Sequence, residues 1–210
     1  MNYIKNPAKI EEKSFEIIQQ IINDIRPDYT FQNKLEEAII KRAIHTTADF
    51  DYLDSLVFQQ DAIAKIIHVL QNKGTIFTDT NMALSGINKR LLDELGCKYH
   101  CYVSDPETME IAKQHGITRS MAGIKLASLK DGPKLFVLGN APTAVYKIIE
   151  MTESGELQAD AVVAVPVGFV GAAECKEEIL ETDIPAIVAR GRKGGSNLAA
   201  AIINAILITM

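Results

Sequence analysis

The sequence predicts an α/β fold, with a mainly parallel sheet of about five strands, helices on both faces and an N-terminal helical segment. After Gly74, short β-branched runs alternate with amphipathic stretches that end at glycine. Before Gly74, apolar residues recur at helical spacing. Strands that alternate with helices favour parallel pairing through right-handed crossovers. We therefore expect a single domain, 1–210, with a helical part, 1–73, and βα repeats, 74–210.

Each element is assigned from its hydrophobic period and its end signals. In the N-terminal part, helices are expected at 10–25, 33–44 and 56–71. Further along, β-branched runs predict strands at 75–78, 98–103, 134–138, 161–165 and 186–189. Each strand precedes an expected helix, at 87–95, 106–115, 142–151, 172–180 and 196–208. Another helix is expected to start at Arg119, after Gly116.

Composition limits the classes of function. The net charge is −5 and no long basic run is present, which argues against a nucleic-acid partner. The longest apolar stretch, 198–210, would span about 20 Å as a helix, too short for a bilayer core of roughly 30 Å, so no membrane partner is expected. Three cysteines and no secretory signal pattern favour a cytoplasmic protein.

Ligands of such sheets gather beyond the carboxyl ends of the strands. Three of the loops expected there are rich in glycine and precede a helix, so their backbone N–H groups are free to meet anionic oxygens. None matches the phosphate-loop or dinucleotide pattern, although a phosphate-binding α/β enzyme remains a competing interpretation. Arg119, Arg192 and Lys193 bring positive charge to these loops, which favours a substrate with several carboxylates.

Two polar residues in the helical part stand out. His45 lies near the end of an expected helix, where the negative end of the dipole favours a held proton, as a proton donor requires. Ser14 projects from the apolar stripe of the first helix. It either bonds back to the preceding turn or faces a ligand. Cys97 and Cys101 indicate buried thiols, and no metal site is expected.

Taken together, these residues belong to a set of motifs that spans nearly the whole chain and resembles the precorrin-8X methylmutase family, also called cobalt-precorrin-8 methylmutase. The motifs are Asn6-Pro7 with Ile10 and Ser14-Phe15, Arg42-Ala43-Ile44-His45-Thr46-Thr47-Ala48-Asp49, Thr78-Asp79-Thr80-Asn81-Met82, Ile117-Thr118-Arg119-Ser120, Gly139-Asn140-Ala141-Pro142-Thr143, Pro166-Val167-Gly168-Phe169-Val170-Gly171-Ala172-Ala173-Glu174 and Gly191-Arg192-Lys193-Gly194-Gly195-Ser196.

The resemblance implies an isomerase of corrin and cobalamin biosynthesis that moves a methyl group from C-11 to C-12 of precorrin-8X or cobalt-precorrin-8. It further implies a homodimer, no cofactor, and cobalt arriving only within the substrate. By the same inference His45 is the proton donor and Ser14 and Arg119 belong to the ligand pocket. We expect the rest of the pocket from Thr46, Asp79, Met82, Ser120, Gly139, Asn140, Thr143, Gly168, Phe169, Val170, Gly171, Arg192 and Lys193. A non-catalytic tetrapyrrole-binding carrier remains the alternative.

Overall fold

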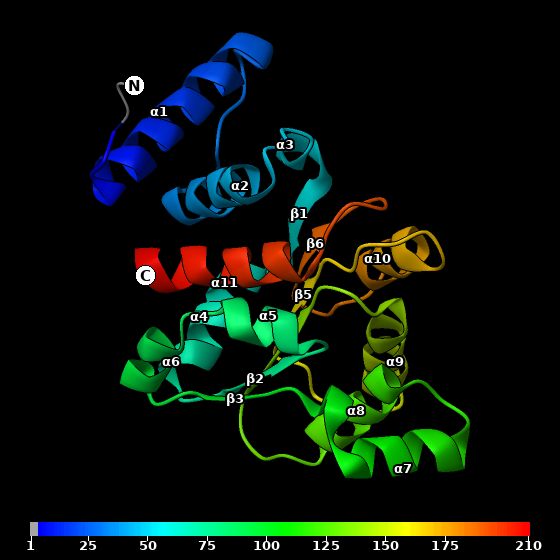
Figure 1. The fold of residues 1–210 in the computed structure, drawn as a ribbon. Coiled ribbons are helices and arrows are strands. Elements are labelled where there is room, and N and C mark those ends of the chain that lie inside the picture. The colour runs from blue at the N-terminus through cyan, green and yellow to red at the C-terminus, as the bar shows by residue number, and fades with distance from the viewer. Residues whose placement is uncertain (1–3) are drawn as a thin grey trace.

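The computed structural model describes residues 4–210 and contains one six-stranded sheet (Figure 1). The strand order is β1-β6-β5-β4-β2-β3, and every neighbouring pair is parallel except β1 with β6. The strands are β1 (Leu56–Gln59), β2 (Thr75–Thr78), β3 (Lys98–His100), β4 (Lys134–Leu138), β5 (Ala161–Ala164) and β6 (Ala186–Ala189). The predicted fold class, an α/β protein with a mainly parallel sheet, is confirmed.

Helices connect the parallel strands and precede them in the N-terminal part. The first five are α1 (Pro7–Ile25), α2 (Lys34–Thr47), α3 (Tyr52–Ser55), α4 (Ala62–Gln71) and α5 (Asn81–Gly86). The next three are α6 (Lys89–Leu95), α7 (Pro106–His115) and α8 (Arg119–Ser128). The last three are α9 (Pro142–Glu153), α10 (Ala172–Leu180) and α11 (Ser196–Thr209).

Both faces of the sheet are buried. Along β4, Leu135 and Val137 belong to one hydrophobic cluster, and Phe136 and Leu138 belong to the other. The alternation follows from the two-residue period of a strand. The first cluster includes residues of α2, α4 and α11, and the second includes residues of α8, α9 and α10 (Figure 1). Helices therefore lie on both sides, as a buried parallel sheet requires.

The first helix stands at the margin of the molecule (Figure 1). Its start is well defined, because the Asn6 side chain accepts hydrogen bonds from the backbone N–H groups of residues 8 and 9, and Pro7 occupies the first turn. Only Ile18 and Ile22 of α1 are buried. By contrast, α2 packs closely on α11, and this contact places the C-terminal end of α2 beside the body of the protein.

The expected helix at 56–71 is wrong in its first turn, and the sheet therefore has six strands rather than about five. Residues 56–59 form β1, which pairs antiparallel with β6. Gln60 and Asp61 adopt positive φ angles and separate this strand from α4. The side chain of Gln59 donates to the carbonyls of Ile179 and Ile184, so tertiary contacts decide the conformation of this short segment.

Two smaller differences concern the neighbourhood of β2 and β3. The helix expected at 87–95 is preceded by α5, which begins at Asn81 with the Thr80 side chain as its cap. The strand expected at 98–103 ends at His100, and Tyr102–Ser104 forms a 3₁₀ turn instead.

Candidate active site

Asp79 organises the carboxyl edge of the sheet. It follows β2 and is buried, with 5% of its surface exposed. Its two carboxylate oxygens accept hydrogen bonds from the backbone N–H groups of Gly139, Asn140 and Ala141 at 2.9, 2.7 and 2.6 Å. Burial raises the pKa of the Asp79 carboxyl, although the three N–H donors act in the opposite direction. With its oxygens occupied in this way, Asp79 shapes the loop after β4 rather than offering a free contact to a ligand.

The start of α11 packs tightly against the same edge. The hydroxyls of Thr80 and Ser196 lie 2.7 Å apart. Gly139 touches the backbone of Ser196 so closely that a Cβ atom at residue 139 would lie 2.6 Å from the Ser196 Cα atom. The glycine in this loop is therefore required by close backbone approach.

Three of the predicted site residues line one small cavity. Asp79, Arg119 and Ser120 surround a space of about 10 Å³, the room of a single water molecule. The neighbouring Thr143 hydroxyl lies 2.9 Å from that of Thr118, the residue that caps α8. These contacts join the loop after β4 to the start of α8 and leave the Arg119 side chain exposed at the rim.

The glycine-rich loop after β6 connects the sheet edge to the histidine segment. Gly195 donates its N–H to the carbonyl of Val165, the residue after β5, at 2.9 Å. The Lys193 ammonium lies 2.5 Å from a carboxylate oxygen of Asp49 and 2.5 Å from one of Asp51. These two bonds raise the pKa of Lys193. Lys193 therefore ties this loop to the turn after α2 and is paired within the chain.

His45 lies in the last turn of α2, as expected, and its ring is exposed. The ring stacks on Phe15 of α1, with centroids 5.3 Å apart and planes 24° from parallel. The Arg42 guanidinium, one turn earlier on the same helix, lies 4.9 Å from the centroid of the same Phe15 ring. A cavity of about 400 Å³ is lined by Phe15 and Arg42 but not by His45. The imidazole of His45 therefore lies at the surface of this chain and not in an enclosed pocket.

Ser14 adopts the first of its two alternatives, because its hydroxyl donates to the Ile10 carbonyl at 2.8 Å. Thr46 is exposed beside His45. The neighbouring Thr47 hydroxyl bonds back to the Ala43 carbonyl at 2.8 Å. Thus Ser14 and Thr46 lie in the N-terminal segment with His45, separate from the small cavity at the sheet edge.

The three residues expected to form an apolar floor are strongly exposed. Met82, Phe169 and Val170 show 71%, 84% and 91% of their surface. They follow β2 and β5, at the same edge of the sheet as Asp79. Arg192 is also exposed, whereas Gly168 and Gly171 are partly buried in the loop that precedes α10. Large exposed apolar side chains of this kind are typical of surfaces that a ligand or partner covers.

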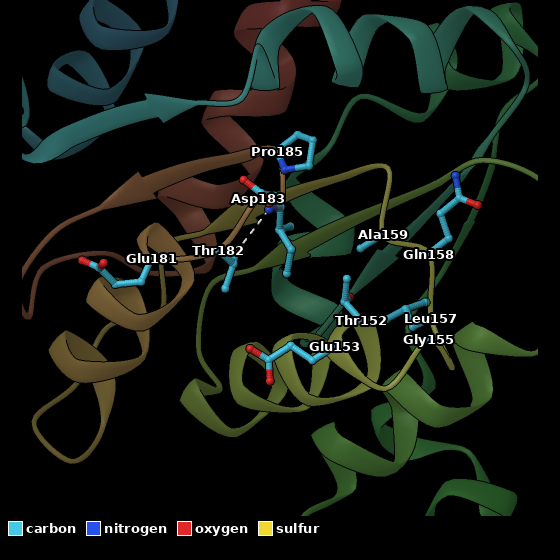
Figure 2. A pocket seen from close by; sticks show the side chains of 11 residues that line it. Thr152, Glu153, Gly155, Leu157, Gln158, Ala159, Glu181, Thr182, Asp183 and Pro185 are labelled. Atoms are coloured by element: carbon cyan, nitrogen blue, oxygen red, sulfur yellow. Dashed lines mark hydrogen bonds between the residues drawn. The ribbon is translucent and has the colours of Figure 1, made fainter.

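A larger cavity lies at the opposite edge and contains none of the predicted site residues. Its volume is about 590 Å³, and it lies between the ends of α9 and α10 and the segments before β5 and β6 (Figure 2). Glu153 and Glu181 border it, and Leu157 and Ala159 line its apolar part. Volume alone therefore does not locate the site that the motifs indicate.

Residues 4–210 contain no cluster of three or more side chains suited to hold a metal ion. Over the same residues, no helix combines the length and apolar character that a membrane crossing needs.

Comparison with known proteins shows where the chain belongs. The family model of precorrin-8X methylmutase matches residues 9–209. The chain belongs to the precorrin-8X methylmutase family. A protein of Salmonella typhimurium named cobalt-precorrin-8 methylmutase is 54% identical over 210 residues, covering 99% of this chain and 97% of the relative. A Sinorhizobium protein named precorrin-8X methylmutase is 32% identical over 98% of this chain and 96% of its own length.

A solved structure gives the same result. The precorrin-8X methylmutase of Thermus thermophilus superposes with a TM-score of 0.82 at 33% identity, covering 95% of this chain and 96% of that one. The resemblance seen in the motifs is thus confirmed, and with it the class of enzyme, an isomerase of cobalamin biosynthesis that performs an intramolecular methyl migration.

Two residues that shape the candidate site were not predicted from the sequence. Asp51 shares the Lys193 ammonium with Asp49. Lys176 of α10 is fully buried and donates to two carbonyls of the loop after β6. Neither carries a sequence signal, since a lysine between cysteine and glutamate in a helical pattern resembles a solvent-facing residue.

Proposed function

We propose that this chain moves a methyl group from C-11 to C-12 of cobalt-precorrin-8 or precorrin-8X, giving cobyrinic acid or hydrogenobyrinic acid. The observation that carries the proposal is the match to the methylmutase family over residues 9–209, together with 54% identity to a cobalt-precorrin-8 methylmutase over almost the whole of both chains. The reaction is a rearrangement, so no atom enters or leaves the substrate.

In this proposal His45 donates a proton to a ring nitrogen. Protonation withdraws electron density from the conjugated ring and lowers the barrier to the 1,5-sigmatropic shift; the histidine recovers the proton when the product forms. His45 lies in the last turn of α2. Phe15 holds the ring from one side and leaves the remainder accessible. A proton transfer of this kind contributes about 10²–10⁴ in rate.

The remaining predicted residues divide by position. The exposed Arg119 and Arg192 side chains and the N–H groups of the glycine-rich loops form a rim for the carboxylate arms of the ring. Met82, Phe169 and Val170 offer apolar surface to its face. Ser14 and Thr46 approach the substrate from the side of His45. Asp79 and Lys193 act on the loops, because their charged groups are already bonded within the chain.

The same proposal includes a homodimer in the cytoplasm that needs no cofactor, with cobalt entering as part of the substrate. Support for the homodimer is the exposure of His45 together with the apolar residues at positions 82, 169 and 170, since a second copy would enclose a ring that one chain leaves open.

Conversion of the precursor by the unmodified protein is the test. Addition of enzyme to cobalt-precorrin-8 is expected to change the visible spectrum to that of cobyrinic acid, with many turnovers per chain. A carrier would bind the ring and leave it unchanged. If ATP or a sugar phosphate raised the melting temperature and a corrin did not, a phosphate-binding enzyme would replace this assignment.

A further inference from the structure

Lys176 is a buried cation that the reaction proposed above does not use. None of its surface is exposed, and within the described part of the chain no carboxylate forms an ion pair with it. Its ammonium instead donates to the carbonyls of Gly191 and Lys193 at 2.9 and 2.7 Å. Burial lowers the pKa of Lys176 to about 8. An unpaired buried charge is costly, and an apolar side chain of the same length would fill this space without that cost.

The two carbonyls belong to the glycine-rich loop after β6, whose backbone also bonds to the loop after β5, through Gly168 N–H to the Arg192 carbonyl and Gly195 N–H to the Val165 carbonyl. Gly191, Gly194 and Gly195 have φ angles of 78°, 155° and 132°, so the loop follows a path that glycine alone adopts freely. Gly194 lies so close to Val165 that a Cβ atom there would come within 2.2 Å of the Val165 carbonyl oxygen. Such a path is flexible in isolation, because glycine loses the most conformational freedom on ordering.

Lys193 is held at both of its ends. Its backbone carbonyl accepts from Lys176, and its ammonium bonds to Asp49 and Asp51 in the turn that follows the histidine helix. The route from the buried cation to His45 is therefore continuous: α10, the glycine-rich loop, the Lys193 side chain and the end of α2.

We propose that Lys176 is a positioning residue, whose buried ammonium fixes the glycine-rich loop in the conformation that lets Lys193 hold the turn after His45. The geometry of the loop does not depend on the reaction. The effect on turnover rests on the function proposed above, so the two are tested by separate measurements.

The structural test follows the carboxyl group of Asp49 by NMR. Burial alone raises its pKa, but the Lys193 ammonium and the Asp51 N–H outweigh burial, and the pKa lies below its ordinary value. Lys193→Met removes the partner and defines the released state. Lys176→Met is expected to raise the Asp49 pKa by the same amount, because Lys193 no longer stays in reach. A Lys176→Met protein whose Asp49 titrates like the unmodified protein would overturn the proposal.

A matched control separates this effect from the loss of any buried lysine. Lys134 is also buried, and its ammonium also donates to a glycine carbonyl, that of Gly132 at 3.1 Å, but it lies at the opposite edge of the sheet. Lys134→Met is expected to leave the Asp49 titration unchanged. A shift of Asp49 in both variants would indicate general loosening and would also refute the specific role of Lys176.

The catalytic test is a double-mutant cycle. Lys176→Met and Lys193→Met are each expected to lower kcat about tenfold to hundredfold, since small displacements of a reacting group cost that much. Because both act through the same contact, the double variant is expected to lose no more than the worse single variant. A double variant whose loss in kcat equals the product of the two single losses would contradict the claim that Lys176 and Lys193 act through the same contact. Failure of the unmodified protein to convert cobalt-precorrin-8 would refute the proposed function. The Asp49 titration would then be the test of whether Lys176 fixes the glycine-rich loop.

Discussion

Replacing Asp79 by asparagine removes the acceptor that holds the loop after β4. The carboxylate accepts three backbone N–H groups, two of them on one oxygen. An asparagine offers one oxygen, so it retains two bonds at best and turns an NH₂ group toward the third donor. Loss of a charge-assisted bond and one buried unpaired donor cost about 2–4 kcal/mol together. At this chain length the expected fall in Tm is about 5–15 °C.

Thermal unfolding followed by circular dichroism at neutral pH measures the fall. Asp160→Asn is the matched control, because the Asp160 carboxylate accepts a single backbone N–H, from Lys134 at 2.8 Å, and the amide oxygen of asparagine can keep that bond. Its expected cost is about 1 kcal/mol or less. Equal falls in Tm for the two variants would refute the view that Asp79 holds the loop through three simultaneous bonds.

Two further predictions concern the loop after β6 and its buried lysine. Gly194→Ala is expected to lower the free energy of unfolding by about 1–3 kcal/mol and also to lower turnover. Gly155→Ala, also at positive φ but facing open space, is expected to leave turnover unchanged. Between pH 8 and 10.5 unfolded Lys176 binds more protons than folded Lys176, so its contribution to stability rises with pH. Urea unfolding at pH 7 and 9 should show that the free energy of unfolding of the unmodified protein rises with pH relative to that of Lys176→Met. A difference between the two free energies that stays constant would contradict the lowered pKa.

Local signals in the sequence were sufficient for most of the parallel sheet. The strands at 75–78, 134–138 and 186–189 and the helices at 106–115 and 172–180 have the predicted bounds. The strands at 134–138 and 186–189 are buried at every position, and the strand at 75–78 is buried at all but its first. The first of these helices begins at a proline and ends before a glycine in the left-handed conformation. In such segments the local preference and the tertiary environment agree.

The remaining features depend on residues distant in the sequence. Strand β1 forms because β6, about 130 residues later, offers an edge for Leu56 and its neighbours. Helical and extended conformations of this short run are otherwise comparable. For the site, the motifs identified the loops, but not the division between residues that face a ligand and those, such as Asp79 and Lys193, whose charges are satisfied inside the chain.

The proton donor is the central claim, and His45→Ala tests it most directly. Single-turnover conversion of cobalt-precorrin-8 is followed by visible absorption, alongside titration with cobyrinic acid to measure product affinity. We predict that the rate falls by about 10²–10⁴ while the product still binds, since the imidazole lowers the reaction barrier and is not needed to hold the ring. A variant that converts the precursor at the unmodified rate would show that the proton comes from another group.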